Sequence, residues 1–252
     1  MLKTLMNNSK STEEDFLKEL LNLNTNNEKL NKLYKDFNTD LNQLYYQDEH
    51  IFHLCCKKDL FHSVVWLISN GINLEIENLE KETAIFYAIR TKGTVILQIL
   101  VENGANINHL NIFNRTALQE AVIRANNRIV NYLLQITRTV SNCDIYGNNL
   151  IFDAISNGNI DIIKRIASIK EININQINND GNTILHKDIV LKNNELALLL
   201  IDFGADPTIL DKEGKSFLFY CISEGIKNID KIQDMVDSIY EHSDGKLCYV
   251  DI

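Results

Sequence analysis

One position recurs along this chain at a nearly constant interval of 33 residues. Successive copies are 33, 33, 33, 34 and 33 residues apart, and most of them are residues whose side-chain oxygen caps the start of a helix well. The copies are His50, Thr83, Thr116, Asn149, Thr183 and Ser216. A period of this length is the signature of a repeat architecture, in which one helical unit stacks on the next. We therefore expect the chain to grow in one dimension rather than around a single central core.

Each copy of this position opens the same apolar pattern. A large apolar residue stands two places after it, and in most copies a small residue stands five places after it. The large residues are Phe52, Ile85, Leu118, Ile151, Leu185 and Leu218, and the small ones include Cys55, Ala88, Ala121, Ala154 and Cys221. A second apolar segment at helical spacing follows, for example at 96–101 and 129–134. The pattern predicts an inner helix whose small face lets neighbouring units approach closely, followed by an outer helix.

The stretch 178–207 contains every element of one unit in order. It has an Asp-Gly turn at 180–181, the capping Thr183, His186 three places later, and a closing Gly-Ala-Asp at 204–206. This order resembles an ankyrin repeat, whose usual motifs are a D-x-x-G turn, then T-P-L-H, then G-A-D. The resemblance implies an all-α ankyrin solenoid of helix-turn-helix repeats with short β-turn tips. It also implies a non-catalytic scaffold that binds other proteins and uses no cofactor.

The chain departs from the family pattern at two kinds of position. The proline of T-P-L-H is absent from every unit, but proline there only pre-sets a helix start. The closing glycine, which supplies the left-handed residue that ends a helix, is replaced by Thr137 and Lys170 in the third and fourth units. We expect strain or irregularity at those two helix ends.

The register divides the chain into three segments. Residues 1–44 are expected to form an amino-terminal tail and a degenerate capping repeat, and residues 45–210 to form five ankyrin repeats. Residues 211–252 keep the turn and the inner helix but lose G-A-D, and their outer helix carries acidic residues between 230 and 241. A polar outer face suits an end cap, because no further repeat covers it. We therefore expect 211–252 to be the carboxy-terminal capping repeat.

The charge balance limits the classes of partner. The formal net charge is -9 and the pI is near 5.2, whereas a nucleic-acid binder needs a basic face. The start has no signal-peptide run, and no stretch reaches the roughly 18 apolar residues of a membrane helix. The five cysteines lack framework spacing and read as reduced thiols. We expect a cytoplasmic protein, monomeric when free, that binds neither nucleic acid nor membranes.

One cluster has the residue types of a metal site. His50, His53 and Cys56 are three residues apart and share a helical face, so a metal-dependent enzyme is an alternative function. Each of the three, however, occupies a structural position of the family: the cap, the motif histidine and a small core residue. A self-assembling structural protein is a further alternative. We assign no metal site and no catalytic residue.

Apolar residues stand at two successive turn tips, where a solvated turn should be polar. The residues four and three places before the cap are Ile112 and Phe113 in one unit, and Ile145 and Tyr146 in the next. The isoleucines could instead pack against each other between turns. Phe113 and Tyr146 are harder to bury in that way.

Arginine is concentrated beside these tips. Four of the six arginines lie within residues 111–143, and aromatic residues beside arginine are the composition of interface hot spots. In the family, partners usually meet the tips and the exposed end of the inner helix. We therefore predict a non-catalytic protein-binding module (an adaptor, an inhibitor or an immunity-type partner) that binds one or more unidentified target proteins at the centre of its concave face. The predicted contact residues are Phe113, Tyr146, Ile112, Ile145, Arg90, Arg115 and Arg124.

Overall fold

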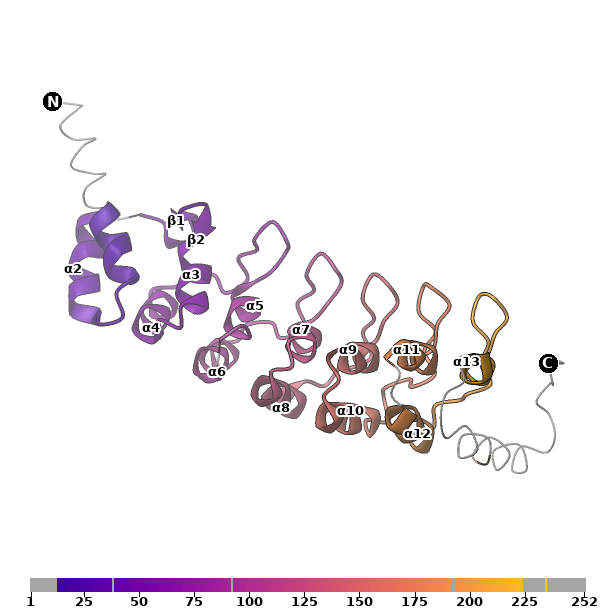
Figure 1. The fold of residues 1–252 in the computed structure, drawn as a ribbon. Coiled ribbons are helices and arrows are strands. Elements are labelled where there is room, and N and C mark those ends of the chain that lie inside the picture. Colours follow the sequence, from indigo (N-terminus) through magenta and orange to yellow (C-terminus); the bar gives the residue numbers. More distant parts are fainter. Residues whose placement is uncertain (1–12, 38, 92, 192–193, 224–233, 235–252) are drawn as a thin grey trace. The chain divides into compact units, whose positions relative to one another are not determined.

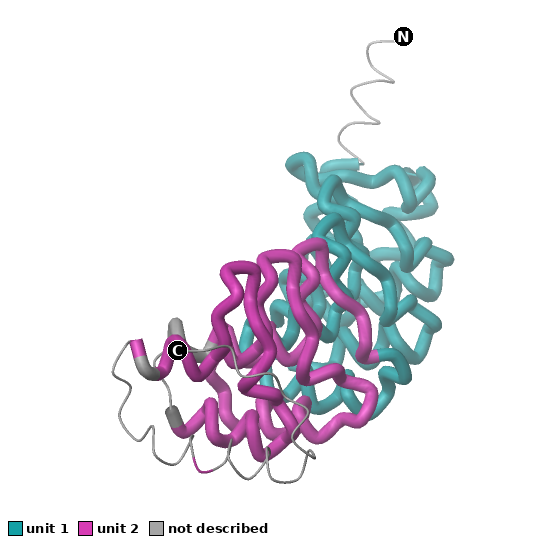
Figure 2. Tube along the Cα trace, turned by 90° about the vertical axis from the view of Figure 1, so that its right-hand side faces the viewer, with its two compact units in different colours: residues 1–139 teal, residues 140–252 magenta. Residues whose placement is uncertain are grey.

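The computed structural model describes residues 13–37, 39–91, 93–191, 194–223 and 234. Within these residues the secondary structure is helical apart from one short strand pair and one isolated bridge. The chain divides into two compact units, residues 1–139 and 140–252 (Figure 2). Each unit is built from short helices that pack in pairs, with a loop extending to one side of each pair (Figure 1).

Unit 1 opens with helical turns at 13–20 and α2 (Asn27–Phe37), followed by a single 3-10 turn, η1 (Leu41–Gln43). Its later helices alternate between an inner and an outer position. The inner helices are α3 (Ile51–Lys57), α5 (Ala84–Ala88) and α7 (Ala117–Ile123), and the outer helices are α4 (Phe61–Ser69), α6 (Val95–Glu102) and α8 (Asn127–Ile136). Each inner helix packs on its own outer helix, and α5 packs on both α3 and α7.

Unit 2 repeats this arrangement. Its inner helices are α9 (Leu150–Asn157), α11 (Ile184–Leu191) and α13 (Phe217–Ser223), and its outer helices are α10 (Ile160–Ala167) and α12 (Asn194–Asp202). The inner helix α11 contacts α9 on one side and α13 on the other, while α10 covers α9 and α12 covers α11. The expected helix-turn-helix repeats are confirmed. The acidic helix expected between 230 and 241 lies outside the described residues, apart from Asp234.

The first tip of unit 1 differs from the later tips because it is a β-hairpin. Strand β1 (Tyr45–Tyr46) pairs antiparallel with β2 (Glu49–His50). The two residues between the strands, Gln47 and Asp48, both have positive φ, 52° and 64°. Two consecutive left-handed residues match the type I′ turn, whose twist suits a two-residue hairpin.

The predicted inner-helix faces are the core of the molecule. The small residues Ala88, Ala121 and Ala154 are fully buried, and so are Cys55 and Cys221. Five of the six predicted large residues are buried as well, and Leu218 on α13 is only half-buried. The buried ones are Phe52, Ile85, Leu118, Ile151 and Leu185. Where two helices approach this closely only a small side chain fits, since protein interiors are close-packed.

The amino-terminal helices cover the open side of the first helix pair. Helix α2 packs on α4, and Phe16 and Tyr34 meet the ring of Trp66 with centroids 5.7 and 5.3 Å away. The indole nitrogen of Trp66 donates a hydrogen bond to the Asn31 side chain at 2.8 Å. Phe16 is fully buried and Trp66 nearly so. These contacts bury an apolar face that the helix pair α3–α4 cannot bury by itself.

The capping prediction is confirmed at some copies and wrong at others. Thr116 accepts a bond from the Gln119 amide at 3.3 Å, and the Gln119 side chain accepts from the Thr116 amide at 3.1 Å, which completes a capping box. Thr83 and Asn149 make no side-chain cap bond. The Asn149 side chain donates instead to the carbonyl of Asn173 at 2.8 Å. At that copy the side chain joins two loops rather than capping the start of α9.

The two helix ends without glycine are irregular but not strained. Gly104, just after α6, has the expected left-handed φ of 89°. Thr137, after α8, has a φ of -81° and an extended backbone, and α10 ends with Ser168 in the right-handed region. Of the expected strain or irregularity, the structure shows irregularity alone, because the chain leaves both helices through conformations open to any residue. Within the described ranges no helix is both long and apolar enough to span a membrane.

Candidate functional site

The later turn tips are closed by one recurring side chain. It stands five residues before the cap and accepts hydrogen bonds from the amides two and four residues further on. In the third unit Asn111 accepts from the amides of Phe113 and Arg115 at 3.0 and 3.1 Å. The same pair of bonds recurs at Asn78, Asp144, Asn178 and Asp211. The sequence analysis missed this position, although Asn or Asp stands there in all five copies, and both residues favour such turns.

Backbone bonds close each of these tips a second time. The amide of Asn111 donates to the carbonyl of Arg115 at 3.1 Å, and the amide of Asn114 donates to the carbonyl of Asn111 at 2.9 Å. The tip of unit 2 that begins at Asp144 has the equivalent bond to Asn148 at 2.9 Å. Because side chain and backbone both hold the loop, the two residues at its end project from fixed positions.

Neighbouring tips within one unit are also joined to each other, and in Figure 1 their loops lie side by side. In unit 1 the amide of Ile112 donates to the carbonyl of Glu80 at 2.9 Å. In unit 2 the amide of Asn179 donates to the carbonyl of Tyr146 at 2.9 Å, and the Asn179 side chain donates to the carbonyl of Ile145 at 2.9 Å. The tips of each unit therefore form a ridge rather than separate loops.

The predicted apolar contact residues lie on these ridges. Ile112 in unit 1 is 44% exposed, and Ile145 and Tyr146 in unit 2 are 47% and 49% exposed. Neither isoleucine is buried between turns, so the alternative in which the two isoleucines pack against each other is wrong. Phe113 is half-buried. Leu79, on the tip before it, is fully exposed and was not among the predicted contacts.

The ring of Phe113 is partly covered by one of the predicted arginines. The guanidinium carbon of Arg115 lies 5.7 Å from the centroid of the Phe113 ring. The same guanidinium is 3.7 Å from the carboxylate of Glu120, and Arg124 approaches that carboxylate to 3.6 Å. Glu120 is buried, so it fixes both arginines beside the tip.

Arg90 is held in a similar way in the turn that follows α5. Its guanidinium forms an ion pair with Glu82 and lies 5.3 Å from the centroid of the Tyr87 ring. The structure therefore brings each predicted arginine of unit 1 onto a carboxylate of the same chain. Sequence reasoning missed these pairings because it treated the arginines as free for a partner.

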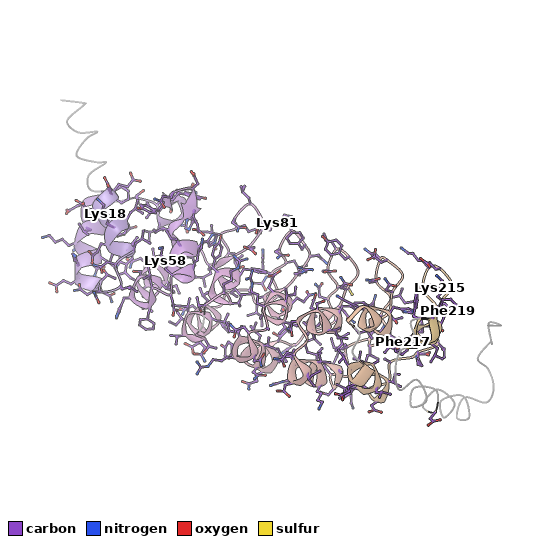
Figure 3. The ribbon with its side chains drawn as sticks, in the orientation of Figure 1. Lys18, Lys58, Lys81, Lys215, Phe217 and Phe219 are labelled. Atoms are coloured by element: carbon purple, nitrogen blue, oxygen red, sulfur yellow. The ribbon has the colours of Figure 1, made fainter. Side chains whose placement is uncertain are left out.

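Lys215 lies over aromatic rings on the last described repeat, where Figure 3 labels it beside Phe219. Its ammonium is 5.4 Å from the Phe219 centroid and 5.6 Å from that of Tyr220. The Tyr220 hydroxyl donates to Asp211 at 2.6 Å, and this hydrogen bond raises the pKa of Tyr220 to about 12. Phe219 remains 44% exposed. A cation over a ring beside a turn tip thus occurs in both units.

The three candidate metal ligands are part of the folded core or its hydrogen bonds. The Nδ1 atom of His50 accepts from the amide of Phe52 at 3.2 Å. The Nε2 atom of His53 bonds the carbonyl of Ile76 at 2.8 Å, and burial lowers the pKa of His53 to about 4. The Cys56 thiol is fully buried, and burial raises its pKa. In the part of the chain that the structure describes, no three His, Cys, Asp or Glu side chains are arranged to hold a metal ion.

His186 joins two repeats. Its Nδ1 atom is 2.8 Å from the Thr183 hydroxyl, and its Nε2 atom is 3.1 Å from the carbonyl of Lys215 in the next repeat. The ring is buried, and desolvation lowers its pKa. The histidine of the T-x-x-H segment is therefore a structural link.

Comparison with known families agrees with the repeat geometry. A profile of the family described as "Ankyrin repeats (3 copies)" matches residues 52–146, 95–178 and 151–242. The "Notch-regulated ankyrin repeat-containing protein A" and "B" of Danio rerio are 37% and 36% identical to this chain over 59 residues, which is 23% of this chain and 53% of each relative. The chain thus spans about half the length of the curated relatives it matches.

Solved structures show the same fold. An ankyrin repeat domain from Acinetobacter baumannii AYE has a TM-score of 0.67 at 21% identity, covering 74% of this chain and 97% of its own. The ankyrin repeat domain of Bcl-3, described as a unique member of the IkappaB protein family, has a TM-score of 0.70 at 19% identity and covers 90% of this chain and 96% of its own. At these identities the likeness concerns the fold alone.

Proposed function

Because the chain belongs to the ankyrin repeat family, whose repeats are generally protein–protein interaction modules, we propose that it is a non-catalytic module whose target protein docks on the turn-tip ridges. The observation that carries the proposal is the combination of exposed apolar side chains with tips that are doubly closed and joined to their neighbours. A binding surface that is ordered before the partner arrives loses less conformational freedom on association. Acting as an adaptor, an inhibitor or an immunity-type partner is consistent with such a surface.

The part of the surface on unit 1 is centred on Ile112 and Phe113. Ile112 is 44% exposed on a loop fixed by Asn111 and by the bond to the Glu80 carbonyl. Burial of a large apolar side chain contributes roughly 1.5 to 3 kcal/mol, so these two residues supply the apolar anchor. The predicted arginines Arg115, Arg124 and Arg90 belong to the same proposed surface. Since each is already paired with a carboxylate, we assign them to the rim, where charges guide the approach more than they add affinity.

The part of the surface on unit 2 is centred on Tyr146 and Ile145. Tyr146 is 49% exposed, and the backbone carbonyls of both residues accept bonds from Asn179. A half-exposed tyrosine with a fixed backbone offers a large contact area at little cost in side-chain entropy. We propose that a target protein contacts this tip as well.

The same proposal includes the domain organisation, the oligomeric state and the location of the protein. Residues 1–44 act as the amino-terminal cap, 45–210 as the five repeats and 211–252 as the carboxy-terminal cap. The free protein is a monomer and uses no cofactor. It binds neither nucleic acid nor membranes, and its acidic net charge of -9 supports the exclusion of nucleic acid. A cytoplasmic location is supported by the buried, reduced thiols of Cys55 and Cys56 and by cysteine spacing that lacks a disulfide framework.

The experiment is a comparison of two double variants with the parent. Tagged protein captures its partner from an extract of the source cells, and mass spectrometry identifies proteins that are enriched. The test variant carries Phe113→Ala and Tyr146→Ala. The control variant carries Val95→Ala and Ile160→Ala, which truncate residues that are 50% and 38% exposed on the outer helices α6 and α10.

The expected result is a protein that the parent and the control variant capture and the test variant does not. Truncating a central anchor costs a complex at least about 2 kcal/mol, which is roughly thirtyfold in affinity. Both variants must first show the parent's melting temperature, within the small shift that exposed truncations cause. If the folded test variant captures the partner as well as the parent does, docking does not occur on these tips.

A further inference from the structure

An open cleft of about 600 Å³ lies between the first two tips of unit 1, and one wall of it is aromatic. The ring of Tyr45 on β1 meets His50 edge-on with centroids 5.1 Å apart, and His50 meets His53 at 5.5 Å. His53 in turn lies flat against Tyr87 on α5, at 4.6 Å and 11°. Tyr45 is 51% exposed, so the wall continues to solvent.

The lining of the cleft carries more carboxylates than cations. Its acidic residues are Asp48, Glu49, Glu77, Glu80 and Glu82, and among the described lining residues its lysine and arginine are Lys57 and Arg90. Lys57 is 3.1 Å from Glu49, and Arg90 pairs with Glu82. Each of these two cations is therefore already paired with a carboxylate of the lining.

Besides Glu49 and Glu82, the lining has three carboxylates. Glu77 lies 3.4 Å from the Nε2 atom of His109, and the other two have no cation beside them. Asp48 stands in the hairpin turn of the first tip and Glu80 on the second tip, and both are exposed. Neither forms an ion pair with any described residue of the chain. The two histidines of the wall do not supply the missing charge, because burial lowers the pKa of His53 to about 4 and also lowers that of His50. The cleft is therefore negative at neutral pH, and a concave site with one sign of charge concentrates ions of the other sign.

The chain itself shows how the cleft receives a guanidinium. Arg90 lies 5.3 Å from the centroid of the Tyr87 ring while its guanidinium bonds the Glu82 carboxylate. Stacking on an aromatic face together with a carboxylate pair is the environment that suits arginine better than lysine. Tyr45 with Asp48 and Glu80 provides the same two elements, and no cation of the described chain occupies them.

We propose that this cleft binds an exposed arginine of a basic segment in the partner protein. The guanidinium stacks on the exposed ring of Tyr45 and pairs with Asp48 and Glu80. This inference rests on the proposed function, because it names the chemistry of one segment of the protein that docks on the tips. It adds a contact point at the first two tips to the apolar anchors of the later ones.

The test uses purified full-length protein and a synthetic probe. The probe is a fluorescein-labelled nonapeptide of alternating glycine and arginine, and its binding is followed by fluorescence anisotropy. Two matched peptides carry lysine or glutamate in place of arginine. The cleft variant is Asp48→Asn with Glu80→Gln, and it is expected to fold because asparagine tolerates the left-handed φ of 64° at position 48 and Glu80 is exposed.

The control variant is Asp161→Asn with Glu102→Gln. It makes the same change in net charge at two exposed carboxylates on the outer helices α10 and α6. The arginine peptide is expected to bind the parent saturably, the lysine peptide more weakly and the glutamate peptide not at all. The cleft variant should lose about tenfold in affinity, or about 1.4 kcal/mol, and the control variant less than twofold.

Two results overturn the proposal: no saturable binding of the arginine peptide to the parent, or an equal loss in the cleft and control variants. The second result means that the probe senses net charge alone. Neither measurement involves Phe113, Tyr146 or the natural partner. A failure of this inference is therefore distinguishable from a failure of the proposed docking on the tips.

Discussion

The guanidinium of Arg115 lies over the ring of Phe113, 5.7 Å from its centroid. A cation at this distance is attracted to the face of an aromatic ring, and the nearby carboxylate of Glu120, at 3.7 Å, holds the guanidinium in place. Phe113 is therefore half-buried by its own chain rather than free in solvent. The apolar anchor proposed for unit 1 is a positioned group, and its position depends on the loop that carries both residues.

The first prediction concerns Asn111, whose side-chain oxygen accepts from the amides of both Phe113 and Arg115. Asn111→Ala removes two hydrogen bonds, and a typical bond contributes roughly 0.5 to 1.5 kcal/mol. We expect the free energy of unfolding to fall by about 1 to 2 kcal/mol in urea titrations. Hydrogen exchange at the amides of Phe113 and Arg115 should accelerate.

The control for this prediction is Asn108→Ala, which truncates an exposed asparagine three residues earlier. Surface substitutions of this kind usually change stability by less than about 0.5 kcal/mol. Equal effects of the two variants on stability and on exchange would show that Asn111 does not hold the tip.

The helix faces could be read from the sequence because they depend on local spacing. The 33-residue period places Ala88 and Ala121 at equivalent positions, and both are fully buried between neighbouring inner helices. Residues of one size at one register position have few ways to pack in a stacked repeat. The order of helices and the buried faces therefore followed from the pattern.

The side-chain bonds at the tips and caps could not be read in the same way. Asn149 is a good cap by residue type, yet its side chain donates to the carbonyl of Asn173, 24 residues later. Thr183 meets the His186 ring at 2.8 Å. A polar side chain can hydrogen-bond to several backbone or side-chain groups, and the three-dimensional distances determine which bond forms.

The candidate site was predictable in its apolar part and not in its charged part. The exposure of Ile112 and Tyr146 follows from apolar residues at turn positions, which the sequence displays. The pairing of Arg124 with Glu120 at 3.6 Å depends on rotamers that the sequence does not specify. Spacing alone also gives no sign of the cleft beside Tyr45, because its walls come from two different repeats.

The second prediction tests the amino-terminal helices. Phe16 is fully buried against Tyr34, Phe37 and Trp66, with ring centroids 5.7 to 5.8 Å apart. Phe16→Ala should cost about 3 to 5 kcal/mol, since it removes a large buried ring. Because Trp66 is the single tryptophan of the chain, its fluorescence should shift to longer wavelength as water reaches it.

A matched truncation, Leu23→Ala, removes a side chain that is 72% exposed in the same amino-terminal segment. It should leave both the stability and the emission of Trp66 close to those of the parent. A Phe16→Ala protein with the parent's unfolding curve would mean that these helices do not cover the first repeat.

The third prediction is a loss of stability on the acid side. Burial lowers the pKa of His53 to about 4 in the folded protein, whereas an unfolded histidine has a pKa of about 6.5. As the pH falls below about 6.5 the unfolded chain takes up a proton first, so the contribution of His53 is complete above that pH and declines towards pH 4. We expect a loss of about 1 to 2 kcal/mol from this residue between pH 6.5 and 5.

The measurement is the dependence of the unfolding free energy on pH between 7 and 5. His53→Gln keeps an N–H donor for the Ile76 carbonyl, which His53 bonds at 2.8 Å, but it cannot take up a proton. Its stability should therefore vary less steeply with pH than that of the parent, whatever its stability at pH 7. An unaltered slope in His53→Gln would contradict the prediction.

The last prediction compares two left-handed glycines of unit 2, one in a turn tip and one at the end of α9. Gly147 and Gly158 both have a left-handed φ, 76° and 73°, so alanine at either position costs about 1 to 2 kcal/mol of backbone strain. A Cβ at Gly158 meets no atom within 4 Å, whereas a Cβ at Gly147 would lie 2.7 Å from Oδ1 and 2.9 Å from the backbone nitrogen of Asn179. Relief of that clash requires the two tips to separate, which breaks the 2.9 Å bond from Asn179 to the Tyr146 carbonyl.

We expect Gly147→Ala to be less stable than Gly158→Ala by at least about 1 kcal/mol, with faster hydrogen exchange at the Asn179 amide in the first variant alone. Equal stabilities and equal exchange would mean that neighbouring tips are not held together at this point, and the ridge proposed as the docking surface of unit 2 would lose its main support.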